Sequence, residues 1–363
     1  VVIGLGHLGV DPSSSPWTSE EVIAHTSGFD AFIDGHSHTV MENVQVQDAS
    51  GKAVTLTQTG SYFANVGEMT IAADGTITTK LIPTHEGMDA GIAAMQTGWV
   101  NTVDDMLGEK IAVGDSDFYV SDPATGKRRI RSAETNLGDF VADGIYAYFN
   151  EVEKLHCDVA IMNGGGIRAD VPAGDWTFKT CKQVSPFGNV ACLMSVTGKQ
   201  IQDALEFAAR FAGEDGKENG GFLQVAGATY EIHTDIPNTV QTDEKNVWIG
   251  SATGTPRVQN VKIYDKASGS YLPLDPGATY ALAGMNYTLR NLGDGFAMFD
   301  GAELIKDYVS EDYLVMSTYA MIFDGADAAG LPHLSSANSP LAAYPGYLLN
   351  YEQPYGAGRI TIL

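Results

Sequence analysis

Three histidines in the first forty residues follow short apolar segments and stand beside glycines. His7 follows the apolar run 1–5, and His36 and His38 follow the apolar run 31–34. Neutral imidazole is a common ligand for zinc, manganese and iron, and ligands of α/β proteins gather at the carboxyl ends of strands. The alternative is that each histidine caps a turn through ordinary hydrogen bonds. Three histidines at two consecutive strand ends favour the metal site.

A second candidate site centres on the glycine-rich segment from Asn163 to Arg168. The apolar run 158–162 precedes it and predicts a strand that ends in a turn. The glycines of this turn, Gly165 among them, are expected to expose backbone N–H groups to a ligand. Arg168 offers a two-pronged guanidinium group to a phosphate or carboxylate, and Arg131 could add a second from the start of a helix. The alternative is a plain tight turn in which Arg168 pairs with an acidic side chain.

Two aromatic residues are placed where a planar ligand could stack on them. Phe187 lies in a loop rich in proline and glycine, and Tyr287 ends a predicted strand. Base–aromatic stacking contributes about 1–3 kcal/mol per base and tolerates different bases. Core packing is the usual alternative for an aromatic residue.

The elements that position the histidines form a β-α-β pattern followed by a meander. The pattern predicts a strand at 1–5, a helix that begins at Ser19 and a strand at 31–34. Further antiparallel strands are predicted at 53–58, 61–71 and 76–82. Apolar residues at helical spacing then predict a connecting helix over 86–108.

The elements around the second site predict a domain with a large central sheet, of the α/β or α+β class. The predicted helices are 132–148 and 199–211, and the predicted strands are 158–162, 229–233, 258–264 and 280–285. We therefore expect a first domain over 1–85, a linker and hinge over 86–115, and a second domain over 116–363.

Composition excludes some classes of partner. The net charge of -24, from 45 acidic and 21 basic residues, argues against a surface that binds nucleic acid polymers. The longest uncharged run, between Asp327 and Glu352, is broken by three prolines and does not predict a membrane span. Cys157, Cys181 and Cys192 are expected to be buried or free thiols, with a Cys181–Cys192 bridge as the less favoured alternative.

The histidine segments resemble a known family. Gly6-His7-Leu8-Gly9, followed by Asp34-Gly35-His36-Ser37-His38-Thr39, is similar to the closing half of the calcineurin-like metallophosphoesterase domain of 5'-nucleotidases. The resemblance implies two divalent ions, zinc or manganese, with His7 and His36 on one ion and His38 on the other. It leaves Asp34 a supporting role.

Roughly residues 115–363 resemble the C-terminal domain of the same family. The matching segments are Arg131 to Asp139, Asn163 to Arg168, Pro186-Phe187-Gly188-Asn189, and Asn286-Tyr287 with Gly293-Asp294-Gly295-Phe296. The resemblance implies that Phe187 and Tyr287 clamp a base, Asn189 binds its edge and Asp294 binds the ribose hydroxyls. It implies that Asn163, Gly165, Arg131 and Arg168 contact the rest of a nucleotide. Six residues separate Tyr287 from Asp294 where the family more often has five, and the extra residue could displace Asp294.

The function implied for the parent protein is hydrolysis of nucleoside phosphates, with nucleotide sugars or 2',3'-cyclic nucleotides as further substrates. The family's other metal ligands precede the first histidine, and no Gly-Asn-His occurs in the 363 residues. The chain begins with an apolar run and no Met, so we expect a C-terminal fragment that is inactive without the missing N-terminal half. The alternative is a non-catalytic nucleotide-binding or nucleoside-binding module. Relatives of this family are usually exported, which implies an extracytoplasmic location in the periplasm, in the cell wall or outside the cell.

Overall fold

The computed structural model describes residues 1–84, 87–214 and 217–363. It divides into two compact units, Val1–Gln96 and Thr97–Leu363, and helix α2 (Ala90–Leu107) begins in the first and ends in the second. His85 and Glu86, where the sequence places the start of the linker, lie outside the described residues. No helix in the described ranges has the length and apolar character that crossing a bilayer requires.

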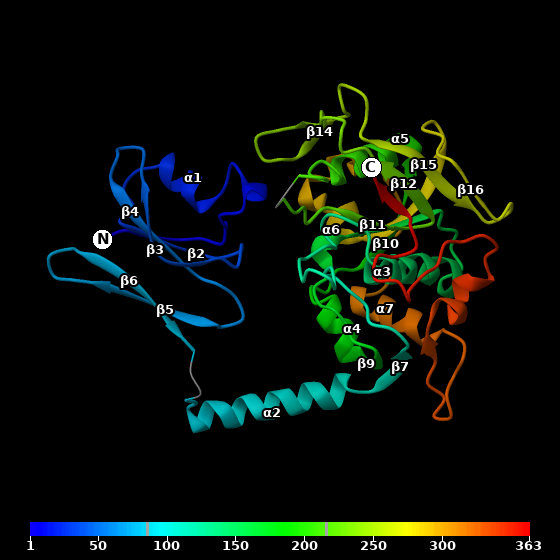
Figure 1. Cartoon of the computed structure of the whole chain (residues 1–363), viewed down its shortest axis with the longest axis horizontal. Coiled ribbons are helices and arrows are strands. Elements are labelled where there is room, and N and C mark those ends of the chain that lie inside the picture. Colours follow the sequence, from blue (N-terminus) through cyan, green and yellow to red (C-terminus); the bar gives the residue numbers. More distant parts are fainter. Residues whose placement is uncertain (85–86, 215–216) are drawn as a thin grey trace. The chain divides into compact units, whose positions relative to one another are not determined.

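The smaller unit is a four-stranded sheet with one helix and a separate hairpin (Figure 1). The sheet has the order β1-β2-β4-β3, with β3 antiparallel to β4 and the other pairs parallel. Its elements are β1 (Ile3–Leu5), α1 (Ser19–Ala24), β2 (Ala31–Asp34), β3 (Val40–Gln47) and β4 (Ala53–Thr59), and the hairpin is β5 (Asn65–Ile71) with β6 (Ile77–Pro83). The predicted β-α-β pattern is therefore confirmed.

Two details of the smaller unit differ from the sequence-based prediction. Strand β3 was not predicted. The strand predicted over 61–71 begins only at Asn65, because Tyr62 and Phe63 have left-handed φ angles of 53° and 56° and form a turn. Such angles are incompatible with an extended strand.

The larger unit is built on a mixed five-stranded sheet with the order β11-β8-β17-β10-β18. β8 and β17 are parallel to each other, and the remaining neighbours are antiparallel. The strands are β8 (Val159–Asn163), β10 (Ala191–Thr197), β11 (Leu223–Ala226), β17 (Thr279–Met285) and β18 (Glu303–Lys306).

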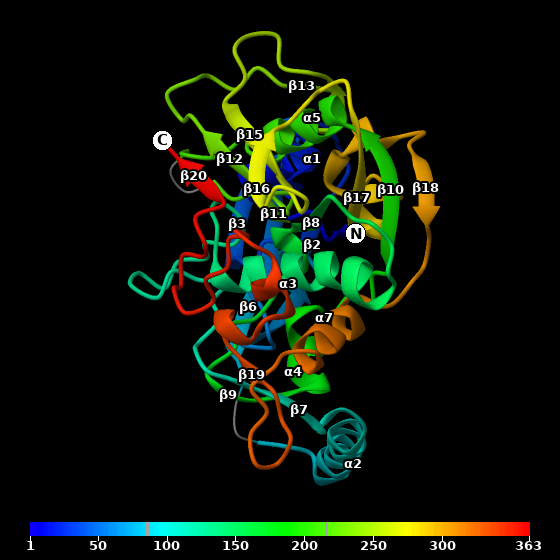
Figure 2. The same ribbon diagram turned by 90° about the vertical axis from the view of Figure 1, so that its right-hand side faces the viewer.

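Both faces of this sheet are buried. Alternate residues of β8 pack into different cores: Ala160 and Met162 join one core with helix α3 (Asn136–Ala147), whereas Val159 and Ile161 join another with helix α5 (Gly198–Ala208). Side chains of a strand alternate between faces, so continuous apolar strands fit a sheet that is covered on both sides. Figure 2 shows α3 lying across the strands.

The remaining elements surround this sheet. A four-stranded sheet has the order β16-β15-β12-β20, a three-stranded sheet the order β19-β7-β9, and β13 pairs with β14. These strands are β7 (Lys110–Gly114), β9 (Gly174–Thr177), β12 (Ala228–Ile232), β13 (Gln241–Thr242), β14 (Trp248–Gly250), β15 (Val258–Asp265), β16 (Ser270–Pro273), β19 (His333–Leu334) and β20 (Ile360–Ile362). The other helices are α4 (Phe178–Val184), α6 (Asn286–Leu289) and α7 (Asp312–Met321). The α/β fold class predicted from the sequence is confirmed, and Cys157, Cys181 and Cys192 are buried free thiols, as expected.

One predicted helix begins later than expected. The helix predicted over 132–148 starts at Asn136, because the Thr135 hydroxyl accepts a hydrogen bond from Gly138 N (3.1 Å) and caps it. Arg131 therefore lies in the turn before the helix rather than at its start.

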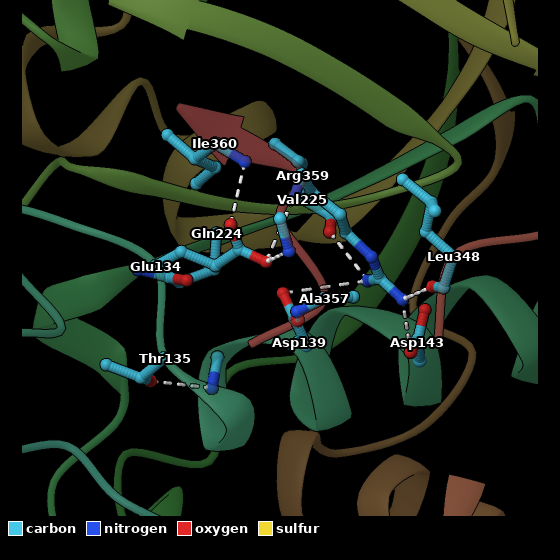
Figure 3. Close-up of polar contacts among 12 residues, drawn as sticks. Glu134, Thr135, Asp139, Asp143, Gln224, Val225, Leu348, Ala357, Arg359 and Ile360 are labelled. Atoms are coloured by element: carbon cyan, nitrogen blue, oxygen red, sulfur yellow. Dashed lines mark hydrogen bonds and ion pairs between the residues drawn. The ribbon is translucent and has the colours of Figure 1, made fainter. Parts of the chain in front are cut away.

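A buried ionic network joins α3 to the last strand (Figure 3). The fully buried Arg359 pairs with Asp143 at 2.7 Å and also donates hydrogen bonds to the carbonyls of Val225 (2.9 Å) and Leu348 (2.6 Å). The Glu134 carboxylate accepts hydrogen bonds from the backbone N–H groups of residues 358–360 at 2.7–3.0 Å. The segment at the start of β20 is thus fixed to α3, and to Glu134 just before it, by charge and by buried and part-buried hydrogen bonds.

Candidate functional site

Four loops of the larger unit emerge at one edge of the central sheet. The parallel strands β8 and β17 end there, and the antiparallel strands β11 and β10 begin there, since Leu223 pairs with Asn163 and Ala191 pairs with Met285. These loops carry the predicted site residues of the second half except Arg131, whose turn packs against the loop after β8. Strand ends of this kind are where α/β folds bind ligands.

The glycine loop after β8 is packed against other backbone. Gly164 N and Gly165 N donate to the carbonyls of Phe222 and Gly220, both at 2.7 Å. The expectation that these two N–H groups face a ligand is therefore wrong. A Cβ on Gly164 would lie 2.3 Å from the Ile130 carbonyl oxygen, so the glycine is required for the close approach of the Arg131 turn.

Arg168 and Phe187 lie together above this loop. The Arg168 guanidinium carbon lies 5.7 Å from the centre of the Phe187 ring, and its Nη1 donates to the Gly165 carbonyl at 3.3 Å. Phe187 is 59% exposed, so it is not a core residue. The ring offers a free face at the position where the sequence predicted a stacking residue.

Arg131 is half-buried and lies close enough to Arg168 for the two positive charges to repel each other. Burial lowers the pKa of Arg131 to about 10, and repulsion from the neighbouring Arg128 and Arg168 acts in the same direction. Within the described ranges, the arginines in ion pairs are Arg128, Arg290 and Arg359. Arg131 and Arg168 therefore present positive charge that no carboxylate of these ranges pairs with.

Tyr287, Asp294 and Asn163 form a connected polar group. Tyr287 Oη donates to Asp294 Oδ1 at 2.9 Å, and Asn163 Nδ2 donates to Asp294 Oδ2 at 3.1 Å. The longer spacing between Tyr287 and Asp294 is accommodated by left-handed turns at Leu292 (φ 56°) and Asp294 (φ 54°). Tyr287 itself lies in the first turn of α6, two residues after β17 ends, rather than at the end of the strand.

The loop that carries Phe187 and Asn189 is held by Asp312 at the start of α7. Asp312 Oδ2 accepts a hydrogen bond from Asn189 N (3.1 Å), and Asp312 N donates to Asn189 O (2.7 Å). Burial raises the pKa of Asp312 to about 6, against the opposing effect of its backbone donors. The backbone of Asn189 is therefore fixed in both directions.

We expect the stability of the larger unit to depend on pH through Asp312. Because its folded pKa of about 6 exceeds its ordinary value of 3.8, the bound proton favours the folded state. This stabilisation is complete below pH 3.8 and is lost as pH rises through 6. Relative to Asp312→Asn, the wild type should lose up to about 3 kcal/mol between about pH 4 and pH 8. Urea unfolding of both proteins at several pH values measures this, and parallel stability curves would contradict it.

The structure adds site residues that the sequence analysis did not select. Arg210 is buried between the rings of Phe207 and Phe211, at 4.0 and 4.8 Å, and its charge acts on Asp294. Buried Gln224 donates to the carbonyls of Ile130 (3.0 Å) and Ala133 (2.9 Å) and so holds the Arg131 turn. Neither residue lies in a segment that the sequence analysis selected as part of a site, and their roles depend on contacts with distant parts of the chain.

In the smaller unit, His7 and His36 come together. Their ring centres lie 5.2 Å apart, with an angle of 70° between the planes. Two imidazoles on one tetrahedral zinc ion, with Zn–N bonds of about 2.0–2.1 Å, would place their ring centres about 5 Å apart. The pair therefore fits a shared ion. Asp34 supports the turn, because its carboxylate accepts hydrogen bonds from Leu8 N (2.8 Å) and Gly9 N (2.9 Å).

His38 lies beside a different aromatic ring. Its ring lies 6.1 Å from the Tyr62 ring. His36 and His38 have positive φ angles of 80° and 56°, a backbone strain that is frequent at functional sites. Across the described part of the chain, no three His, Cys, Asp or Glu side chains are grouped closely enough to hold a metal ion. His7 and His36, two of the three predicted ligands, are therefore close together, and residues 1–84, 87–214 and 217–363 hold no complete ligand set.

The larger unit is thus a mixed α/β domain whose predicted site residues gather at the ends of its central strands. The sequence profile of the 5'-nucleotidase C-terminal domain matches residues 112–301, more than half of the chain. The chain belongs to the 5'-nucleotidase C-terminal domain family.

Individual relatives are similar over most or part of the chain. The trifunctional nucleotide phosphoesterase protein YfkN of Bacillus subtilis is 30% identical over 87% of this chain, and an apyrase of Tabanus yao is 26% identical over 88%. UshA of Escherichia coli is 26% identical over 50% of the chain. The chain spans 20%, 58% and 28% of the lengths of these three relatives.

Solved structures share the fold over nearly the whole chain. A 5'-nucleotidase precursor from Thermus thermophilus matches with a TM-score of 0.64 at 23% identity, over 94% of this chain and 61% of that one. A putative 5'-nucleotidase from Staphylococcus aureus matches with a TM-score of 0.55 at 17% identity, over 92% and 56%.

Proposed function

We propose that the chain is the nucleoside-binding part of a metal-dependent phosphohydrolase that acts on nucleotides. The observation that carries this proposal is the pair Arg131 and Arg168, which form no ion pair within the described ranges although the chain holds 45 acidic residues. Guanidinium groups without a carboxylate partner are suited to bind phosphate. The exposed Phe187 lies against one of them and offers a stacking face for a base.

The roles of the remaining residues follow from their chemistry. Tyr287 offers a second ring, Asp294 accepts hydrogen bonds from ribose hydroxyls, and Asn163, Gly165 and Asn189 lie along the same edge. His7 and His36 would hold one divalent ion, zinc or manganese, and His38 would contribute to a second. Such ions would polarise the phosphoester and supply the nucleophile. The further ligands that two ions need would come from elsewhere in the whole protein.

Nucleotide sugars and 2',3'-cyclic nucleotides are further candidate substrates of the whole protein. The alternative function is a non-catalytic nucleotide-binding module, in which the whole protein would also lack the family's other metal ligands. We also propose an extracytoplasmic location, on the family resemblance alone, and rotation of the larger unit about a hinge in 86–115.

Calorimetry and a hydrolysis assay test this function. We expect the 363-residue chain to bind adenosine in the micromolar to millimolar range and AMP more tightly, because only AMP engages the two arginines. We expect no hydrolysis of AMP by this chain alone with Zn²⁺ or Mn²⁺, and hydrolysis by the full-length protein. If neither ligand binds at millimolar concentration, the proposed site is wrong. If the full-length protein binds AMP but never hydrolyses it, the binding module is correct.

A further inference from the structure

The Tyr287 side chain has two separate surfaces in the site. One face of its ring lies against Gly293, where an added Cβ would come within 2.5–2.6 Å of three ring atoms. Its hydroxyl donates to Asp294 Oδ1 at 2.9 Å. Tyr287 is 37% exposed, so part of the ring remains available to a ligand while the hydroxyl is engaged.

The Asp294 carboxylate is fixed from two sides. Tyr287 donates to one oxygen, and Asn163, which is buried, donates to the other at 3.1 Å. An ionised carboxylate has about four lone-pair positions, so each oxygen can still accept one more hydrogen bond. Because a carboxylate only accepts, the ligand group that completes it must supply two donors close together.

The turn that carries Asp294 requires this support. Leu292 and Asp294 both have left-handed φ angles, 56° and 54°, with Gly293 between them. Such a backbone is costly for non-glycine residues and persists where the surroundings fix it. The hydroxyl of Tyr287 keeps its proton at all working pH values, since burial and then Asp294 raise its pKa to about 12.

We propose that the Tyr287 hydroxyl is a positioning group that holds Asp294 to accept both hydroxyls of a vicinal diol, so that the site selects ribonucleosides over their deoxy counterparts. The inference rests on the proposed nucleoside-binding function. The stacking role that the family resemblance implies for Tyr287 needs only its ring. The present inference assigns a separate role to its hydroxyl. Tyr287→Phe would keep the ring and leave Asp294 with one donor fewer.

The test compares adenosine with 2',3'-dideoxyadenosine, which keeps the base and lacks both hydroxyls. For the wild type, we expect calorimetry to give a preference for adenosine of about 10- to 100-fold, because a ligand without the hydroxyls leaves the Asp294 acceptors unpaired. Tyr287→Phe should reduce the affinity for adenosine about 5- to 10-fold and change that for dideoxyadenosine by less than about twofold. Asp294→Asn should abolish most of the preference.

A matched control removes a hydroxyl elsewhere. Tyr308 is 57% exposed and its ring lies 4.7 Å from the Arg290 guanidinium, so Tyr308→Phe should leave both affinities unchanged. An equal loss for both ligands in Tyr287→Phe, or no loss for either, would overturn the positioning role and leave the nucleoside site intact. If the wild type binds neither ligand, the proposed function fails and this inference fails with it. Thermal melts of all variants identify a folding defect. If Tyr287→Phe melts like the wild type and keeps the same preference for adenosine, this also counts against the inference.

Discussion

Replacing Arg359 by methionine is expected to destabilise the larger unit by about 3–5 kcal/mol, the loss typical of breaking a buried ion pair from one side. The substitution leaves Asp143 buried without its cation, and Asp143 also accepts hydrogen bonds from the hydroxyls of Tyr347 and Tyr351, both at 2.7 Å. Three tyrosines are linked in this way, since Tyr351 also contacts Tyr319 Oη at 2.7 Å. Urea unfolding followed by circular dichroism measures the loss.

Two comparisons separate buried charge from a general effect of losing an arginine. Arg290 pairs with Asp307 at 2.7 Å with both side chains about a third exposed, so Arg290→Met should lose at most about 1 kcal/mol. Combining Arg359→Met with Asp143→Asn should recover part of the stability, because Asp143 no longer leaves an unpaired charge in the core. Similar small losses for Arg359→Met and Arg290→Met would show that the network is not important for stability.

Arg168→Ala is expected to weaken the binding of AMP about 10- to 100-fold and to change the binding of adenosine by less than about threefold. A hydrogen bond to a charged group contributes about 1.5–3 kcal/mol, and only AMP carries the phosphate. Arg131→Ala should act in the same direction. Calorimetry with both ligands measures each effect, and equal losses for AMP and adenosine would argue against phosphate binding by these arginines.

Arg168→Ala, which should weaken AMP binding, is not expected to lower the stability of the ligand-free protein. Arg168 lowers the pKa of Arg131 by repulsion, so its removal relieves an unfavourable interaction in the absence of ligand. We expect Arg168→Ala to melt at the same or a higher temperature than the wild type, as is common for residues kept for binding. Lys110→Ala, which removes an exposed cation that pairs with Asp175, serves as the control and should leave AMP binding unchanged.

The sequence predicted elements well where the apolar period was strong. β8, β12, β15 and β17 form close to their predicted ranges because their residues are apolar on one or both faces. Strand β3 was missed because it exposes most of its length, and polar strands carry little periodic signal. β7, which is as long as β8, and the mostly buried β10 were also missed, and the structure offers no physical reason for these two.

The site was predicted only as far as strand ends could indicate it. Asn163 and Asp294 were selected separately, but their hydrogen bond joins residues 131 positions apart and follows from the sheet order. The segment from Arg131 to Asp139 was matched to the family as one stretch, with a binding role expected for Arg131. The structure divides it: Arg131 lies close to Arg168, whereas Glu134 fixes the backbone at 358–360. Spacing alone does not separate a candidate binding residue from one that holds the chain.

The position of Arg359 also sets an order of events during protein synthesis. Asp143 emerges from the ribosome 216 residues before the arginine that neutralises it. Until then the Asp143 carboxylate of α3 lacks the arginine with which it is buried in the folded domain. Contacts between residues this distant in sequence form late in folding. Until they form, the partly folded chain exposes apolar surface. The larger unit is therefore expected to complete its fold only after Arg359 has been made, which makes nascent chains of this protein candidates for chaperone protection.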